Sequence, residues 1–367
     1  MSGGATAAIP DAMMLARPIR SSVAHKRGVR RGAGKILISL LMFLAVGAVG
    51  THAQSETPIE TELLATRRVM PAVGPGLRGV CRGPGGNYYV LSAPGDTVLI
   101  YDAAGKRVGQ VPAEPVGAAA IVYGESLSVD DSGRVAVADR GASGVKIYAP
   151  DGSLAVFVRV ASPESVAFLG GGELAVASVS GKHLVAVYDI TGRLLREFGD
   201  PTDVAEQSEQ PLPVQQASMG LIATDASSDV YFAFDFLPAV TVLKYDRLGY
   251  ALFDISSKIA EFGLAPPTAA QTEKDEIARI QGGGSIAPDR VITGLGVNPK
   301  NQDLWVSAGT LLLHFDKEGD RVASYHTYTP SGGRLEVTTI LVESDRLLLG
   351  ADPFGLYEFA LPDEVTH

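Results

Sequence analysis

The chain has very few of the residues from which proteins build covalent cross-links and zinc sites. Only one of its 367 residues is a cysteine, Cys81, so no intramolecular disulfide can stabilise the fold. Four of its six histidines follow residue 53: His183, His314, His326 and His367. One of these is the terminal residue and another lies inside a predicted strand, so a three-histidine zinc site is not expected. The protein must therefore be held together by its apolar core.

Basic residues are also scarce once the N-terminal segment is set aside. Residues 1–53 carry seven Lys or Arg and one Asp, which leaves 24 basic and 40 acidic residues, a net charge near −16. A surface this acidic repels phosphate groups, so binding to nucleic acid or to an anionic membrane is not expected. We expect a monomer whose partner is a protein or a small-molecule ligand.

A long apolar run lies near the N-terminus. ILISLLMFLAVGAVG, residues 36–50, follows a cluster of basic residues and precedes Thr51, His52 and Ala53. The run is shorter than the roughly 20 residues that span a membrane, and with a small residue behind it the layout is typical of a cleaved signal peptide. We predict a signal peptide over residues 1–53 and a secreted or periplasmic protein. The alternative is an uncleaved membrane anchor through residues 36–50.

Six repeats occupy the rest of the chain. In each repeat an apolar run ends on a small or acidic residue, and eight to ten residues later a second run ends on an aromatic residue. The first position holds Ser92, Asp139, Ser178, Asp235, Ser307 and Gly350, and the second holds Tyr101, Tyr148, Tyr188, Tyr245, Phe315 and Phe359. Alternating apolar residues between Asp-Gly and Ser-Gly turns predict four short antiparallel strands in each repeat.

Repeated four-stranded units of this kind are typical of β-propeller blades, which bury their faces by stacking on their neighbours. We therefore predict an all-β, six-bladed β-propeller that forms a single domain over residues 54–367. The last repeat leaves too little chain after Phe359 for a fourth strand. The segment 61–70, TELLATRRVM, precedes the first repeat, and we predict that this N-terminal strand completes the last blade.

The second repeat, SLSVDDSGRVAVADRGASGVKIYAPDGSLAVFV, resembles an NHL repeat in its VAVAD segment and in the aromatic residue before its PDG turn. The resemblance implies a six-bladed propeller. NHL proteins include protein-binding, RNA-binding and lyase members, and related propellers hydrolyse lactones and esters, so the fold does not choose a function. The calcium-dependent hydrolases use carboxylate and Asn side chains on inner strands, whereas Asn87, Asn298 and Asn301 are predicted in turns. We expect no cofactor, with calcium only under the hydrolase alternative.

Candidate ligand-binding residues stand at the start of each predicted innermost strand. The repeat register assigns this position to Arg78, Glu125, Glu164, Gly220, Thr293 and Thr338, which we predict to surround one mouth of the central channel. The two glutamates with Arg78 on the preceding blade would suit a cation or an amine-bearing ligand, or an acid and base. The alternative is that they are solvated turn residues with one ion pair. No residue is assigned as catalytic or as a metal ligand.

Two connections are far longer than the others, residues 201–217 and 257–290, and both are expected on the face of the channel mouth. The second contains a predicted amphipathic helix, AAQTEKDEIARIQ, that three glycines end. These segments are either spacers or lid-like insertions over a binding site. We interpret the protein as an exported binding or scaffold module, with a calcium-assisted hydrolase or an NHL-type lyase as the alternative, so enzymatic activity stays open.

Overall fold

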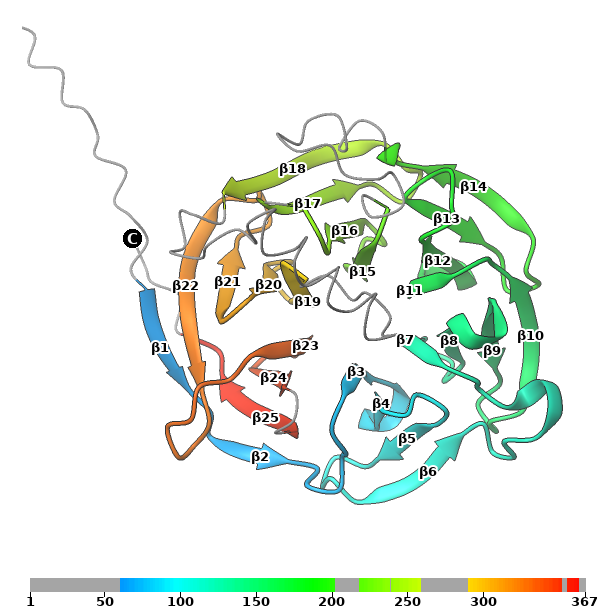
Figure 1. The fold of residues 1–367 in the computed structure, drawn as a ribbon, viewed down its shortest axis with the longest axis horizontal. Helices are drawn as coiled ribbons and strands as arrows, with labels where there is room; N and C mark the ends of the chain where they lie inside the picture. The colour runs from blue at the N-terminus through cyan, green and yellow to red at the C-terminus, as the bar shows by residue number, and fades with distance from the viewer. Residues whose placement is uncertain (1–59, 202–217, 238, 259–289, 352–354, 363–367) are drawn as a thin grey trace, which may run out of the picture. The chain divides into compact units, whose positions relative to one another are not determined.

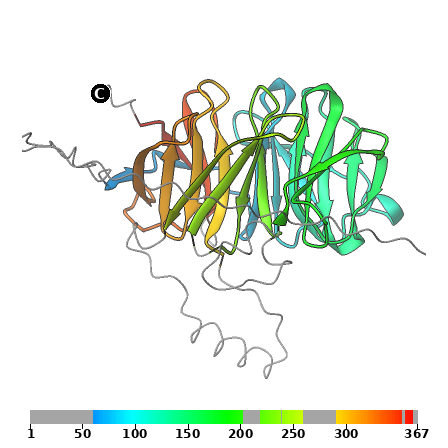
Figure 2. The same cartoon turned by 90° about the horizontal axis from the view of Figure 1, so that it is seen from above.

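The computed structural model describes residues 60–201, 218–237, 239–258, 290–351 and 355–362. These residues form six β-sheets arranged as a ring around a central channel (Figure 1), which confirms the predicted six-bladed β-propeller. Seen from the side, the strands of each sheet run between the two faces of the ring (Figure 2). No helix in this part of the chain is long and apolar enough to cross a membrane. The predicted signal peptide, the predicted helix and most of both insertions lie outside the described residues.

The blades follow one another along the chain, and each runs from an innermost strand at the channel to an outer strand. Blade one contains β3 (Leu77–Arg82), β4 (Tyr88–Ser92), β5 (Val98–Tyr101) and β6 (Arg107–Val111). Blade two contains β7 (Gly124–Val129), β8 (Val135–Asp139), β9 (Gly144–Tyr148) and β10 (Leu154–Arg159). Blade three contains β11 (Pro163–Leu169), β12 (Glu173–Ser178), β13 (Val185–Tyr188) and β14 (Leu194–Phe198).

The second half of the ring has the same order. Blade four contains β15 (Gly220–Thr224), β16 (Val230–Phe234), β17 (Ala239–Tyr245) and β18 (Ala251–Lys258). Blade five contains β19 (Ile292–Val297), β20 (Leu304–Ala308), β21 (Leu311–Phe315) and β22 (Arg321–Tyr328). Blade six contains β23 (Val337–Val342), β24 (Arg346–Ala351) and β25 (Gly355–Ala360). Short 3-10 turns are η1 (Pro84–Gly86), η2 (Gly117–Ala119), η3 (Arg140–Ala142) and η4 (Gly170–Gly172).

The N-terminal segment closes the ring, but it does so as two strands and not as one. β2 (Arg67–Val69) pairs antiparallel with β25 and is the outer strand of blade six, as predicted. β1 (Glu60–Leu64) instead pairs in parallel with β22 and adds a fifth strand to blade five. Between them Ala65 is buried in the apolar layer that joins these two blades. The single strand predicted over 61–70 is therefore corrected, because the segment crosses from one open sheet edge to the next.

Apolar layers between neighbouring blades form the core. There are six clusters of buried side chains in the described part of the chain, and each one joins two adjacent blades around the ring. Val90, Val137 and Phe232, from three different blades, are fully buried. Each blade therefore buries its faces only by stacking, as expected of a repeat architecture.

Hydroxyl groups on the innermost strands join neighbouring blades near the channel. Ser126 Oγ and Ser128 Oγ on β7 accept hydrogen bonds from backbone N–H groups of β11, at 3.3 and 2.9 Å. Ser165 Oγ on β11 accepts one from Ile222 N on β15, at 2.9 Å. The innermost strands belong to different sheets and are not joined by a backbone ladder. Serine side chains supply the hydrogen bonds between them instead. These contacts hold the channel wall in a fixed geometry.

Candidate functional site

All five non-glycine candidate residues occupy the same structural position, a β-bulge at the beginning of an innermost strand. In each case the pairing with the second strand skips one residue, and the skipped residues are Arg78, Glu125, Glu164, Thr293 and Thr338. A bulge inserts an unpaired residue and redirects its side chain. All five line a central cavity of about 370 Å³. The structure therefore brings them together at one end of the channel, which we call the channel mouth.

The hydroxyls of Thr293 and Thr338 are occupied by contacts between strands. Thr293 Oγ1 donates to Val337 O at 2.5 Å and lies 2.9 Å from Ser307 Oγ. Thr338 Oγ1 lies 3.5 Å from the carbonyl oxygen of Leu77 on the neighbouring blade. The charged side chains of the channel mouth are therefore better candidates for ligand binding than the two threonine hydroxyls.

On blades one and two, Arg78, Glu125 and Arg140 form a group that we call the outer triad. Arg78 Nη1 lies 2.9 Å from Glu125 Oε2, and Arg140 Nη1 lies 3.3 Å from Glu125 Oε1. The guanidinium of Arg78 also lies over the ring of Tyr123, 4.0 Å from its centroid. Both oxygens of Glu125 thus have a cationic partner, and the outer triad carries one net positive charge.

On blades three and four, Glu164 and Asp235 form a second group, the inner pair, which one arginine bridges. Arg290 Nη2 lies 3.2 Å from Glu164 Oε1, and Arg290 Nε lies 3.4 Å from Asp235 Oδ2. The two carboxylate side chains are 2% and 0% exposed. Among the described residues, Glu164 Oε2 and both oxygens of Asp235 have no hydrogen-bond partner. Buried carboxylates without donors are rare and point to a functional position.

Asp235 differs from the residues that occupy the same register position in other blades. Asp139, in blade two, accepts hydrogen bonds from the backbone N–H groups of Val122, Tyr123 and Ala142 and from Lys146 Nζ at 2.8 Å. In blade two this position therefore secures the loop that leads into the innermost strand. At Asp235 the side chain has no such role.

In blade four the pairing of the innermost strand begins at Gly220, which pairs with Phe234. This pair is equivalent to Gly79 with Leu91 in blade one, so the position of the bulged residues is Met219 in blade four. A Cβ on Gly220 would lie 2.4 Å from Ala233 O and 2.6 Å from the ring of Phe232, so only glycine fits. Asp235, the residue after Phe234, contacts the cavity-lining Arg290 but does not itself line the cavity.

Burial dominates the electrostatics of the inner pair. It raises the pKa of the Asp235 carboxyl well above its usual range, and Arg290 offsets only part of this effect. Burial likewise raises the pKa of Glu164, the negative charge of Asp235 raises it further, and Arg290 and Arg140 oppose the shift. At Asp139 burial acts in the same direction, but the hydrogen bonds from Lys146 and the backbone outweigh it and lower the pKa. The inner pair therefore holds a proton to a higher pH than ordinary carboxyls do.

Within the described ranges, no group of three or more His, Cys, Asp or Glu side chains could hold a metal ion. The carboxylates of the channel mouth alternate instead with Arg78, Arg140 and Arg290. Calcium binding stays a prediction of the hydrolase alternative alone.

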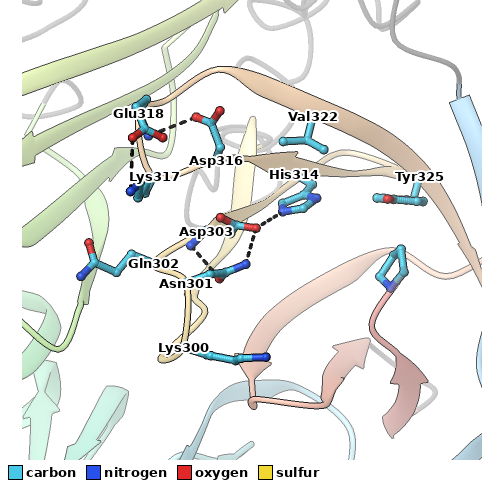
Figure 3. A pocket seen from close by; sticks show the side chains of 11 residues that line it. Lys300, Asn301, Gln302, Asp303, His314, Asp316, Lys317, Glu318, Val322 and Tyr325 are labelled. Atoms are coloured by element: carbon cyan, nitrogen blue, oxygen red, sulfur yellow. Dashed lines mark hydrogen bonds and ion pairs between the residues drawn. The ribbon is translucent and has the colours of Figure 1, made fainter. Parts of the chain in front are cut away.

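A second cavity, of about 540 Å³, lies beside the hairpin turns of blade five (Figure 3). His314 Nε2 lies 2.7 Å from Asp303 Oδ2, which also accepts a hydrogen bond from Asn301 Nδ2 at 2.8 Å. The His314 ring stacks on Trp305 with centroids 4.2 Å apart. Charges of both signs line the cavity, and the exposed Lys317 and Glu318 pair with each other at 3.5 Å. Its carboxylates already have partners, so the channel mouth is the stronger candidate.

Sequence reasoning missed Asp235 and Arg290 as site residues. Asp235 was recognised only as the end of an apolar run, and Arg290 was assigned to the end of an insertion. Gly220 gives no signal, because the equivalent positions of blades one and five are also glycines, Gly79 and Gly294. Arg140 was also missed, because it lies outside the register position from which the candidates were taken.

Comparisons with known proteins support the fold. No protein-family model matches the chain, and no curated protein matches its sequence. The fold is similar to the WD40 repeats of RRP9, at 10% identity over 82% of this chain and 100% of that chain, with a TM-score of 0.52. A protein of unknown function from Bacteroides thetaiotaomicron is similar at 12% identity over 82% of this chain and 75% of that chain, with a TM-score of 0.52. Virginiamycin B lyase from Staphylococcus aureus has a TM-score of 0.48 at 13% identity, over 78% of this chain and 95% of that chain. At these identities the likeness shows the fold alone.

Proposed function

We propose that the protein is an exported binding module that takes a small ligand, or an exposed group of a peptide or protein, at the channel mouth. The observation that carries the proposal is the inner pair, in which Glu164 and Asp235 are buried and three of their oxygens accept no hydrogen bond from the described residues. A buried polar group without a partner costs about 1–3 kcal/mol, and a ligand that supplies N–H or O–H groups would recover this free energy. The NHL-like character of the second repeat and the signal-like N-terminus belong to the same proposal.

The chemistry of the site indicates a hydrogen-bond donor as the ligand. All three unpartnered atoms are carboxylate oxygens, which only accept hydrogen bonds when ionised. The acidic charge of the chain favours the approach of neutral or basic molecules over acidic ones. The cavity, at about 370 Å³, is large enough for a small ligand or for one side chain of a partner.

A fragment screen by ligand-observed NMR tests the proposal. Three sets would be compared, namely primary amines, neutral polyols and amides, and carboxylates. We expect donor-rich fragments to bind the wild type and to lose most of their affinity in Asp235→Asn. Glu173→Gln is the matched control, because it removes one negative charge at an ion pair with Arg196 on the outer part of blade three. Equal binding by Asp235→Asn and the wild type would contradict the proposal.

Acid–base catalysis is the second candidate function, and the raised pKa of both carboxyls favours it. A carboxyl that holds a proton near neutral pH in the wall of a cavity, as Glu164 does, is suited to general acid catalysis, as in an ester- or lactone-hydrolysing enzyme or a lyase. Assays with simple esters and lactones over a range of pH would decide. Turnover that disappears in Glu164→Gln but persists in Glu173→Gln would favour the enzyme over the binding module.

A further inference from the structure

When both carboxyls are ionised, the inner pair carries two negative charges and has one cationic partner, Arg290. Two buried carboxylates share a single guanidinium, and Arg290 touches only one oxygen of each, at 3.2 and 3.4 Å. The outer triad does not correct this, because Arg78 and Arg140 are both bound to Glu125. Among the described residues, Glu164 Oε2 and Asp235 Oδ1 accept no hydrogen bond and also have no contact with Arg290.

We propose that the ligand of this site is cationic, a primary ammonium or a guanidinium group, and that its binding displaces one proton held between Glu164 and Asp235. The inference rests on the proposed function and specifies its ligand. The exchange is balanced, since one proton leaves to solvent when one positive charge enters. No bond other than the O–H bond of the carboxyl is broken.

Geometry favours a compact cation over other ligands. An ammonium group has three N–H donors on one nitrogen, which is enough for both Glu164 Oε2 and Asp235 Oδ1, the two oxygens that Arg290 does not contact. An anion would face two buried carboxylates, and a neutral hydroxyl would leave most of the acceptors unpartnered. Arg290, whose side chain is 36% exposed, lines the cavity together with Glu164, and Asp235 contacts Arg290.

Charged groups on the neighbouring elements change the pKa values of Glu164 and Asp235 and therefore affect this proton exchange. Glu125 on β7 and Arg140 in η3 both act on Glu164, the first raising its pKa and the second lowering it. Glu125 also raises the pKa of Asp235, whereas Arg290 lowers it. Tyr123, in the loop before β7, acts on Arg290 and raises its pKa. Burial outweighs these charges for both carboxyls and keeps a proton on the pair to a pH above the usual carboxyl range.

The test is an NMR titration of the whole mature protein with ethylammonium and with methylguanidinium at pH 5.5, 6.5, 7.5 and 8.5. Both probes stay cationic over this range, so only the protein changes its charge. We expect the affinity to rise about tenfold per pH unit while the pair holds its proton, and then to level off. Calorimetry in two buffers of different ionisation enthalpy should show release of about one proton per bound cation.

Three variants make the result specific. Asp235→Asn leaves Glu164 and Arg290 as a balanced pair, so cation binding should weaken at least tenfold and lose its pH dependence. Arg290→Gln deepens the charge deficit and should bind the probes as well as the wild type or better. Glu173→Gln should follow the wild type. Trp305 fluorescence reports whether each variant is folded, and the wild-type pH profile decides the matter even if a variant does not fold.

The outcomes separate this inference from the proposed function. Cation binding that does not vary with pH, or binding of neutral donors in preference to cations, overturns the exchange and leaves a binding site at the inner pair. Loss of cation binding in Arg290→Gln also overturns it, because Arg290 would then be part of the ligand contact. Absence of binding by every class of fragment overturns both.

Discussion

Asp139 and Asp235 occupy the same register position in two blades, and changing each to asparagine should have opposite effects on stability. Asp139→Asn weakens a site at which a carboxylate accepts three backbone N–H groups and neutralises Lys146, whose side chain is 5% exposed. Asp235→Asn removes a buried charge whose oxygens accept no hydrogen bond from the described residues and whose contact is Arg290 Nε at 3.4 Å. The first variant should be destabilised and the second stabilised.

The magnitudes follow from the contacts. Breaking a buried ion pair from one side costs about 3–5 kcal/mol, so Asp139→Asn should lose an amount in this range. Relieving an unsatisfied buried acceptor should return about 1–3 kcal/mol in Asp235→Asn. The gain depends on pH, because the pKa of Asp235 is higher in the folded protein than the value of about 3.9 in the unfolded chain. The wild type therefore loses stability as pH rises from about 4 through the raised pKa, and the advantage of the variant appears over that interval.

Urea unfolding at pH 4, 6 and 8.5 measures both effects, with the fluorescence of Trp305 as the signal. Trp305 is the only tryptophan, is 1% exposed and stacks on His314, so its emission should change on unfolding. The difference between Asp235→Asn and the wild type should be small at pH 4 and largest at pH 8.5. A variant that is less stable than the wild type at pH 8.5 would refute the assignment of Asp235 as an unsatisfied carboxylate.

Three further predictions concern closure, processing and metal content. Deletion of residues 54–70 should lower the unfolding free energy by several kcal/mol, because the buried Met70 and Ala65 alone represent about 2–4 kcal/mol of apolar burial; an unchanged melting temperature would exclude closure by this segment. Mass spectrometry of the exported protein should find an N-terminus near Gln54, whereas residues 36–50 retained in a membrane fraction would support the anchor. Metal analysis of the purified protein should find no stoichiometric calcium, and bound calcium would favour the hydrolase.

The repeats predicted the fold well because blade structure depends on local signals. Turn residues and alternation are properties of a few adjacent positions, and the two register positions located all six blades. The division of the N-terminal segment into two strands was not predictable. Its apolar residues Leu63 and Leu64 suit pairing with the open edge of blade five as well as that of blade six. Half of the candidate site could be predicted. The position of Glu164 follows from the repeat register, whereas the importance of Asp235 depends on the hydrogen bonds that its side chain does not receive in the folded protein. Arg290 lies in no repeat at all.

The strands that close the ring are the first of the propeller to be synthesised. Thr66 and Glu358 lie 292 positions apart and are joined by a hydrogen bond of 2.8 Å. During translation, β1 and β2 emerge before β22 and β25 exist, and they cannot pair until nearly the whole chain has been made. Until then the nascent propeller has open strand edges at both ends, which are sites for pairing with other chains. The step that completes the fold thus joins the oldest and the newest parts of the polypeptide.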